Sequence, residues 1–419
     1  ILSASAHRLG IDDFIEIAMD ESPDLNISRA DYNASVQRTR NALGDYLPRL
    51  DLTGSAGVIG IKSNSSAQDL DNSSELLTGT LSASQLIYDF GKTGGNIDAF
   101  GYDANASFAG LQQTISNKVY EVKEAYYTAL EAKSLIGVNE ENVQLNEKQY
   151  ERSRRYFEAG IRTRIDVTDA KVNLISARLG LQNAHYDFDR ARVKLERVIG
   201  TEPLGGGYVL MTPTFDSLNL FETLPDVSQP VKTLEIYAFE HRFELKGYAQ
   251  NMQSARARLT STRGGYYPRI FVQGDYTYTK TGDEAMELFM PEQQWDAMVA
   301  LNWNLFEGMK TDARVEEQRA NVMKSSAQYS DAKLRIRQEV ADAHIQVLKN
   351  RDSVKLSQSL AEAAKEKFVQ AQKRYENGLS DYIELQQARQ GYIDAASDLY
   401  VNYYNFYIAL ALQDRAIGR

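Results

Sequence analysis

The sequence contains an internal repeat: its recognisable short motifs recur after about 220 residues. Residues 46–50 (YLPRL) match residues 266–270 (YYPRI), and residues 157–160 (FEAG) match residues 375–378 (YENG). The register holds from near residue 14 to the C-terminus, a length over which chance does not produce such agreement. Two similar halves predict a pseudo-symmetric structure in which each half is part of something larger.

Composition excludes several classes of function. The net charge of −10 argues against a nucleic-acid partner, which needs clustered basic residues. The chain has no cysteine, so we expect no thiol chemistry, no cysteine-ligated metal and no lipid on an N-terminal cysteine. No stretch reaches the roughly 18 apolar residues of a membrane-spanning helix. The N-terminus lacks the pattern of a signal peptide, so we expect a mature chain.

Two long helices are predicted, at residues 92–158 and 310–376. Neither stretch contains a proline. Apolar and small residues recur at alternating spacings of three and four, as in helices packed side by side. A helix of this length extends for about 100 Å, which no ordinary globular domain needs. Further helical segments are predicted at 11–45, 163–199, 231–264 and 381–416.

The stretch from 268 to 306 is predicted to form a β-hairpin of membrane-spanning length. Its apolar residues alternate with polar ones over about ten residues per strand, the length of a tilted strand that crosses a bilayer. We expect the apolar face to carry aromatic side chains at the membrane interfaces. These membrane-facing aromatics are Tyr276, Tyr278, Trp295 and Trp303.

A second, weaker hairpin is predicted at 48–90. Leu52 occupies the position of Val272, but Gln85 stands where the second half has Trp303. The hairpin tips are expected to be polar loops, at 61–79 and at about 281–294. The alternative is a pair of half-buried hairpins on a water-soluble domain.

These elements divide the chain into three parts. Residues 1–200 form the first structural repeat, residues 231–419 form the second, and residues 201–230 connect them. The connector holds half of the eight prolines and three consecutive glycines, so we expect an irregular segment packed around the helices. In each repeat a proline breaks the first helical segment before the hairpin begins.

The predicted hairpins require an oligomer. Four strands cannot close a barrel, and an open edge in lipid leaves backbone groups without partners at several kcal/mol each. Two chains would supply eight strands and a filled interior, whereas three would supply twelve strands and room for a pore.

Short motifs that occur once in each half carry a resemblance to a known family. They are the junctions 46–49 and 266–269, the strand-to-helix turns 86–91 and 305–308, and the helix tips 160–169 and 378–385. In order, spacing and duplication, over essentially the whole chain, they resemble the TolC-like outer-membrane factors (outer membrane efflux proteins) of Gram-negative bacteria.

The resemblance implies an α+β membrane protein that forms a homotrimer. A 12-stranded β-barrel in the outer membrane, with four strands per chain, would be continued by a long α-helical barrel in the periplasm. This channel-tunnel would be the passive exit duct of a tripartite efflux pump or a type I secretion system. The implied partners are outer-membrane lipid, a periplasmic adaptor (membrane fusion) protein and an inner-membrane transporter.

The resemblance also implies a gate at the periplasmic helix tips, where acidic and basic side chains close the tunnel. The gate candidates are Arg162, Asp166, Asp169, Asp381 and Glu384. The tip turns expected to contact the adaptor are Gly160, Ile161, Gly378 and Leu379. The family places the arginine in the second half, whereas here it is in the first, so particular pairings do not carry over. The alternative is that the acidic residues only stabilise the N-terminus of the following helix, where Asp and Glu are favoured.

Other functional classes account for less of the sequence. An enzyme is not expected, and neither is a cofactor or a metal, because the histidines show no ligand spacing: His7, His185, His241 and His344. An elongated coiled-coil scaffold of the cell envelope is the main alternative, but it leaves the apolar face of 295–305 unexplained. A simple porin leaves the long helices unexplained. The sequence leaves open whether a drug, a metal or a polypeptide is exported.

Overall fold

The computed structural model describes residues 1–419 except for 1–6, 66–67, 162, 203–207, 212–219 and 283–291. The chain divides into two compact units. The sheet unit comprises Ala30–Ala109 and Lys246–Asp331. The helical unit comprises Ile1–Arg29, Gly110–Leu245 and Ala332–Arg419. Two helices, α3 (Lys92–Glu158) and α8 (Lys310–Glu376), contribute residues to both units.

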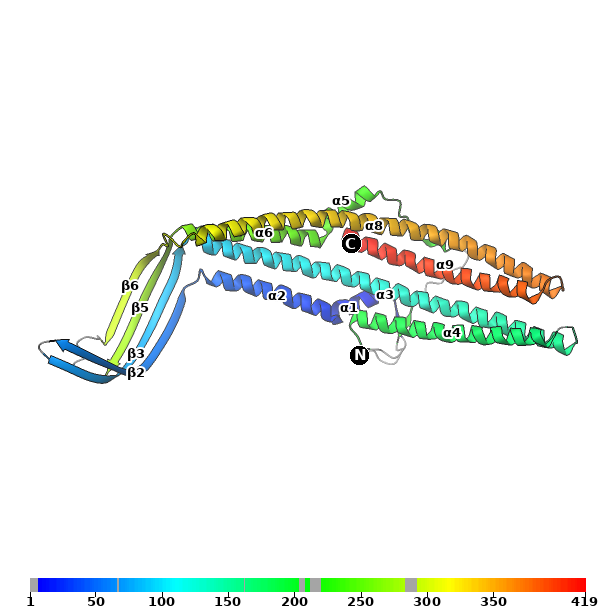
Figure 1. Ribbon diagram of the computed structural model, residues 1–419, viewed down its shortest axis with the longest axis horizontal. Coiled ribbons are helices and arrows are strands. Elements are labelled where there is room, and N and C mark those ends of the chain that lie inside the picture. The colour runs from blue at the N-terminus through cyan, green and yellow to red at the C-terminus, as the bar shows by residue number, and fades with distance from the viewer. Residues whose placement is uncertain (1–6, 66–67, 162, 203–207, 212–219, 283–291) are drawn as a thin grey trace. The chain divides into compact units, whose positions relative to one another are not determined.

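A four-stranded antiparallel sheet characterises the sheet unit (Figure 1). In spatial order its strands are β2 (Arg49–Ser65), β3 (Gln68–Tyr88), β5 (Arg269–Thr281) and β6 (Gln293–Asn302). Continuous pairing joins β2 to β3, β3 to β5 and β5 to β6, with one irregularity near Leu86. Within the described part of the chain, β2 and β6 are edge strands that each have one neighbour.

The strands of the first hairpin are longer, and its loop is shorter, than the sequence predicts. Residues 61–65 and 68–79 were expected to be a polar loop, but they are strand, paired as far as Ser65 and Gln68. The prediction was wrong because a backbone hydrogen-bond ladder does not require apolar side chains, so a stretch of serines and asparagines can extend it.

The second hairpin is shorter than the sequence predicts. β6 ends at Asn302, opposite Arg269 where β5 begins, so the residues that follow have no strand to pair with. Trp303, predicted to lie on the strand face, therefore lies beyond the strand. Its indole Nε1 donates a hydrogen bond to the backbone carbonyl of Tyr266, at 3.1 Å. Most of the loop expected at about 281–294 lies outside the described residues.

Close contacts join the start of α3 to α6 (Phe243–Arg263) and to Gly264, the residue that follows α6. A Cβ atom on Gly95 would lie 2.7 Å from the backbone nitrogen of Ser261. A Cβ atom on Gly264 would lie 2.7 Å from the Cβ of Lys92. No larger residue fits at either glycine unless the backbone moves, so these glycines set the distance between the two segments.

The strand-to-helix turns use left-handed backbone conformations in both halves. Phe90 and Gly91 have φ angles of 55° and 85°, and Gly308 and Met309 have φ angles of 61° and 64°. A bulky residue rarely adopts this conformation, so Phe90 and Met309 store local strain where the chain changes direction.

The helical unit contains the later parts of α3 and α8 together with four complete helices. These are α1 (Ile11–Glu21), α4 (Arg164–Ile199), α5 (Val231–His241) and α9 (Tyr382–Ile417). The helices α3, α4, α8 and α9 are each followed by a left-handed glycine, which lets the chain satisfy the last helical carbonyls. These glycines are Gly160, Gly200, Gly378 and Gly418. Among the described residues, no helix is both long enough and apolar enough to span a membrane.

The segments predicted as helical at 11–45 and 231–264 each consist of two helices. Ser22 is extended between α1 and α2 (Pro23–Gly44), because the ring of the following proline disfavours a helical residue before it. α5 and α6 separate at Arg242, which is also extended. Arg242 is buried and forms ion pairs with Glu244 and Glu339, so these contacts stabilise a break that no proline causes.

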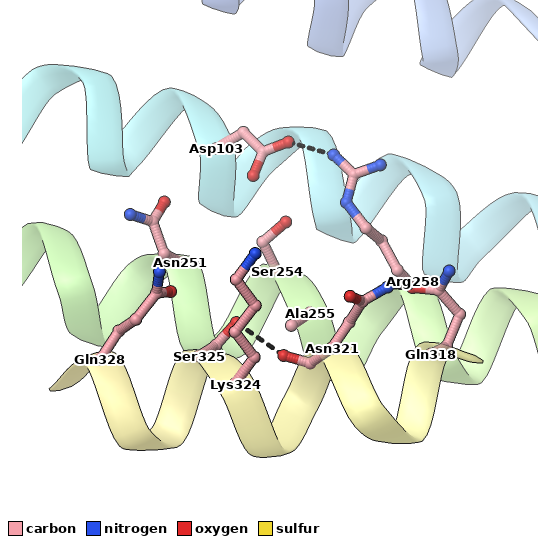
Figure 2. A pocket seen from close by; sticks show the side chains of 10 residues that line it. All are labelled: Asp103, Asn251, Ser254, Ala255, Arg258, Gln318, Asn321, Lys324, Ser325 and Gln328. Atoms are coloured by element: carbon pink, nitrogen blue, oxygen red, sulfur yellow. Dashed lines mark hydrogen bonds and ion pairs between the residues drawn. The ribbon is translucent and has the colours of Figure 1, made fainter. Parts of the chain in front are cut away.

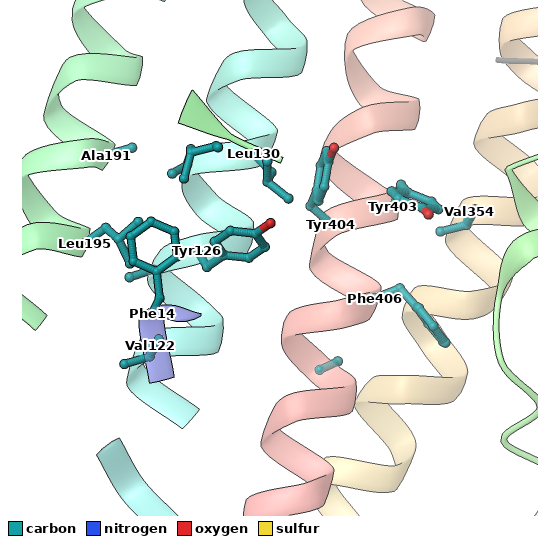
Figure 3. Packing of buried hydrophobic residues seen from close by; sticks show 14 of the residues in the cluster. Phe14, Val122, Tyr126, Leu130, Ala191, Leu195, Val354, Tyr403, Tyr404 and Phe406 are labelled. Atoms are coloured by element: carbon teal, nitrogen blue, oxygen red, sulfur yellow. The ribbon is translucent and has the colours of Figure 1, made fainter. Parts of the chain in front are cut away.

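The core of the helical unit is rich in aromatic side chains (Figure 3). The ring of Phe14 on α1 lies 5.7 Å from that of Tyr126 on α3 and 5.4 Å from that of Tyr208. On α9, Tyr404 and Phe406 are also fully buried in this cluster. Aromatic side chains bury large apolar areas, so this cluster contributes strongly to the cohesion of the unit.

A short parallel sheet lies in the helical unit and was not predicted. It pairs β1 (His7–Leu9) with β4 (Tyr208–Leu210), a part of the segment expected to be irregular. The other regular element of that connector, among the residues described, is the 3₁₀ helix η1 (Phe221–Thr223). The ammonium group of Lys133 on α3 donates to the carbonyl of Leu210 at 3.0 Å, which attaches the connector to a long helix.

Candidate functional site

One face of the four-stranded sheet carries apolar rows that cross all four strands, although Gln85, beside Val272, interrupts it as the sequence predicts. The register brings one residue from each strand into a row, namely Leu52, Leu81, Tyr276 and Trp295. The next row on this face consists of Leu50, Ala83, Gly274 and Ala297. Paired residues point to the same side of a sheet, so the apolar side chains form a continuous surface. Trp295 is 76% exposed, and no other part of the unit covers it.

Three of the four aromatic residues predicted to face a membrane share this apolar face. Tyr276 and Tyr278 lie two residues apart on β5, and Trp295 lies opposite Tyr276 on β6. Trp303 does not belong to the face, because it follows the end of the strand.

The opposite face of the sheet is polar in its central rows, with an apolar row that contains Phe271 at the helical end. Its central row consists of Asp51, Ser82, Asp275 and Asp296. Arg49 forms an ion pair with Asp51 at 2.6 Å. Asp275 lies directly opposite Asp296, and like charges in that position repel each other. Such a pair is tolerated where water solvates it, so this face is suited to water and the other to lipid.

The polar face of the sheet continues onto the helices of the sheet unit. A cavity of about 860 Å³ is lined by Arg49 and Gln273 from that face, and by Thr262 on α6 and Arg314 on α8. These sides of α6 and α8 therefore border the same space as the polar face.

A polar groove lies further along the same sides of α3, α6 and α8 (Figure 2). All but one of its lining side chains are polar: Asp103, Asn251, Ser254, Arg258, Gln318, Asn321, Lys324, Ser325 and Gln328, with Ala255. Arg258 and Asp103 form an ion pair at 2.5 Å. The groove has a volume of about 270 Å³, and it extends the hydrophilic wall that begins at the sheet.

The tip turns between the paired helices expose large apolar side chains. Gly160 and Gly378 have φ angles of 73° and 72°, which turn the chain sharply after α3 and α8. Ile161 is 66% exposed and Leu379 is 70% exposed. Of the four residues predicted to contact an adaptor, the two glycines therefore set the backbone geometry of the turns, and the isoleucine and the leucine are exposed there.

Two of the gate candidates cap helices. A carboxylate oxygen of Asp166 accepts hydrogen bonds from the backbone nitrogen and the hydroxyl of Thr163, at 3.0 and 2.9 Å. Asp381 accepts a hydrogen bond from the backbone nitrogen of Glu384, at 2.8 Å. These bonds satisfy N–H groups that the first turn of a helix leaves unpaired.

The remaining gate candidates have different surroundings. Glu384 forms an ion pair with Arg374 on α8 at 2.9 Å. Asp169 is exposed and has no ion pair or cap contact within the described part of the chain. Arg162 lies outside the described residues. The structure thus connects Glu384 to the preceding helix and leaves Asp169 open to solvent.

Stripes of exposed apolar residues on α4 and α8 were missed by the sequence reasoning. On α4 they recur at every seventh position: Ile165, Val172, Leu179, Tyr186 and Val193. On α8 they recur at every eleventh position: Leu334, Ile345 and Leu356. All are more than half exposed. Seven- and eleven-residue repeats are typical of helices that pack along a neighbouring helix, and the spacing alone could have revealed both stripes.

The described residues include no group of three or more His, Cys, Asp or Glu side chains placed to hold a metal ion. The geometry combines a two-faced sheet, a polar groove, exposed apolar helix stripes and capped tips.

Comparison with known proteins gives one family and a consistent group of relatives. The profile of the outer membrane efflux protein family matches residues 14–201 and 237–419. The probable efflux pump outer membrane protein TtgC of Pseudomonas putida is 20% identical, over 94% of this chain and 79% of its own length. The alkaline protease secretion protein AprF of Pseudomonas aeruginosa is also 20% identical, over 98% of this chain and 85% of its own length.

Solved structures show the same fold. The outer membrane protein VceC of Vibrio cholerae aligns with a TM-score of 0.82 and 17% identity, over 97% of this chain and 96% of that chain. At this identity the likeness concerns the fold alone, which is mostly helical with a smaller amount of sheet.

Proposed function

Because this chain belongs to the outer membrane efflux protein family, we propose that three copies form one continuous channel across the outer membrane and the periplasm. The family relationship confirms the predicted resemblance. The protein is an outer-membrane channel of the efflux and secretion type, and it is not an enzyme. This relationship favours the channel over the coiled-coil scaffold.

The observation that carries the proposal is an open sheet with one apolar and one polar face. In lipid, the unpaired backbone groups of β2 and β6 would each cost several kcal/mol. Pairing β6 of one copy with β2 of the next removes both edges. Three copies supply twelve strands, which enclose a lumen, whereas eight strands leave an interior filled by side chains. The row that contains Trp295 then faces lipid, and the row that contains Asp275 faces the lumen.

The apolar stripes support the same assembly in the helical unit. The α4 stripe that contains Leu179 and the α8 stripe that contains Ile345 are exposed within a single chain. We propose that they pack against neighbouring copies, so that the helices close into a barrel. The two repeats, 1–200 and 231–419, would then alternate around the axis, with 201–230 connecting them.

We further propose that the tip turns form the gate and the adaptor-docking surface. Three-fold rings of carboxylates repel one another and attract cations. Because Asp166 and Asp381 cap helices and Glu384 binds Arg374, Asp169 is the carboxylate best placed for contact between chains, with Arg162 as its candidate partner. The exposed apolar side chains of Ile161 and Leu379 would contact the adaptor, which connects the channel to an inner-membrane transporter.

The names of the two relatives indicate two kinds of exported cargo. One is named as an efflux pump component and the other as a secretion protein for alkaline protease. This chain is 20% identical to each. We therefore propose the shared role, a passive exit duct, and assign the choice of cargo to the transporter and adaptor.

Two measurements test the proposal. Native mass spectrometry in detergent should give three times the chain mass of 47.1 kDa. A stable monomer would refute the closed barrel. In planar bilayers, Asp169→Asn should raise the ion conductance, because it removes the proposed ion pair with Arg162 that would hold the tips closed. Lys171→Gln, two residues further along α4, is the control and should leave the conductance unchanged.

A further inference from the structure

Arg389 on α9 is a buried arginine that no carboxylate neutralises within the described part of the chain. Only 3% of the residue is exposed. Among the described residues, its side chain donates one hydrogen bond, to the amide oxygen of Gln386. A guanidinium group has five N–H donors, so most of its hydrogen-bonding capacity is left over. Burial lowers the pKa of Arg389, so its surroundings oppose the positive charge.

A small cavity lies beside Arg389, between α3, α8 and α9. Its volume is about 40 Å³. Lys148 and Arg152 line it from α3, Gln372 lines it from α8, and Arg389 lines it from α9. A cavity needs about 10–15 Å³ to admit one water molecule, so this one admits a few waters or a single small ion.

The charges around the cavity are unbalanced. Its lining contains three cationic side chains and no carboxylate. Arg152 is already neutralised by Glu376 on α8, which it binds at 2.7 Å and which also accepts a hydrogen bond from Gln372 at 2.9 Å. These two contacts lower the pKa of Glu376, the bond from Gln372 first, so it is firmly ionised there. Lys148 and Arg389 have no ion pair among the described residues. Water solvates the exposed Lys148, so Arg389 is the buried positive charge that no carboxylate compensates.

We propose that this cavity is a binding site for one small oxyanion, either inorganic phosphate or the carboxylate of a small organic acid. Buried charges in proteins are normally paired, and an oxyanion would supply the missing partner for Arg389. The guanidinium fork suits the geometry of oxyanions, and Lys148 adds a mobile positive charge at the rim. The apolar side chains of Leu145 and Phe368 limit the size of the ligand.

The bound anion would brace the helices of a single chain. Arg152 and Lys148 belong to α3 in the first predicted repeat, whereas Arg389 belongs to α9 in the second. An anion held between them links the two helical hairpins near their tips. The site lies within one chain, so it does not depend on the trimer proposed above.

The test uses the purified full-length chain in detergent. Thermal unfolding is followed against increasing phosphate, and in a second series against acetate, with sodium chloride added to keep the ionic strength constant. A site that binds only the folded chain should raise the unfolding temperature saturably, by about 3 °C at a hundredfold excess over the dissociation constant. A rise with phosphate, with acetate or with both supports the site and identifies its ligand. No saturable rise with either anion overturns it.

Two variants and one control locate the effect. Arg389→Gln should abolish the rise, and without added anion it should unfold no earlier than the wild type, because it removes an unpaired buried charge. Lys148→Gln, at the exposed rim, should fold normally and weaken binding at least tenfold. Arg178→Gln, an exposed arginine paired with Glu147 away from the cavity, should keep the full rise. An undiminished rise in both cavity variants would show that the anion acts elsewhere.

Discussion

Replacing Asp166 with alanine should loosen the first turn of α4 by about 1–1.5 kcal/mol. The magnitude follows from the two hydrogen bonds that its carboxylate accepts from Thr163, at 3.0 and 2.9 Å. The return bond, from the backbone nitrogen of Asp166 to the Thr163 hydroxyl, is long at 3.5 Å. Most of the capping energy therefore depends on the carboxylate. Thr163→Ala should cost less, about 0.5 kcal/mol, because the backbone nitrogen of Thr163 keeps its acceptor.

Hydrogen exchange measured by mass spectrometry on the peptide that begins α4 reports this loss directly. Since 1.4 kcal/mol is a factor of ten, exchange in the first turn of Asp166→Ala should be about five to ten times faster than in the wild type. Asp166→Asn should fall between the two, because its amide oxygen still accepts one bond. Asp169→Ala is the control, since Asp169 makes no cap contact in the described structure and its loss should leave exchange nearly unchanged.

Equal exchange rates in Asp166→Ala and Asp169→Ala would refute the assignment of Asp166 to the cap. Conductance adds an independent check in planar bilayers. If Asp166 serves the cap and Asp169 serves the gate, Asp169→Asn raises conductance while Asp166→Asn changes it little. The reverse order would show that the charge of Asp166 closes the tunnel in spite of its hydrogen bonds.

Three further predictions concern assembly, acid stability and the lipid face. Leu179→Glu places a charge on the α4 stripe and should shift the detergent-purified protein from trimer toward monomer in native mass spectrometry. Lys118, through a hydrogen bond and then its charge, holds the pKa of Asp24 below its usual 3.8. This contribution is complete above that value and is lost as the pH falls through the lowered pKa, so thermal unfolding of the wild type and of Lys118→Met should converge in strong acid. Val299→Arg, on the apolar face of β6, should cost about 2–4 kcal/mol of folding in lipid, whereas Met298→Arg on the polar face should cost little. Equal losses, in a denaturant titration of the protein in lipid vesicles, would mean that the face assignment is wrong.

The long helices could be predicted because their signals are local. Neither α3 nor α8 contains a proline, and each is followed by a glycine in the left-handed conformation. Both helices have the predicted bounds, 92–158 and 310–376. The residues next to a helix end determine where it caps or breaks, so these ends can be predicted from the local sequence. The division into two repeats with a connector stays a prediction, since it concerns symmetry rather than any single contact.

The hairpin ends could not be predicted, because strand length is decided by the partner strand. Ser63 and Asn64 look like loop residues, yet they pair because β3 continues opposite them. Trp303 continues the apolar alternation, yet it leaves the strand because nothing pairs with it beyond Arg269. The pairing of β1 with β4 joins residues about 200 positions apart in strands of three residues, which are too short to show a period.

The tips show why a duplicated sequence did not identify the gate. At a separation of 218 residues, Thr163 corresponds to Asp381 and Asp166 to Glu384. Both halves cap the following helix, but the first needs Asp166 for this, while in the second Asp381 provides the acceptor itself. Glu384 is thereby free to bind Arg374, at 2.9 Å. The residue that corresponds to Arg374 in the first half is a tyrosine at position 156, which offers no such charge. The same carboxylate position therefore serves a cap in one hairpin and an ion pair in the other, so the role of a tip residue follows from its contacts and not from its place in the repeat.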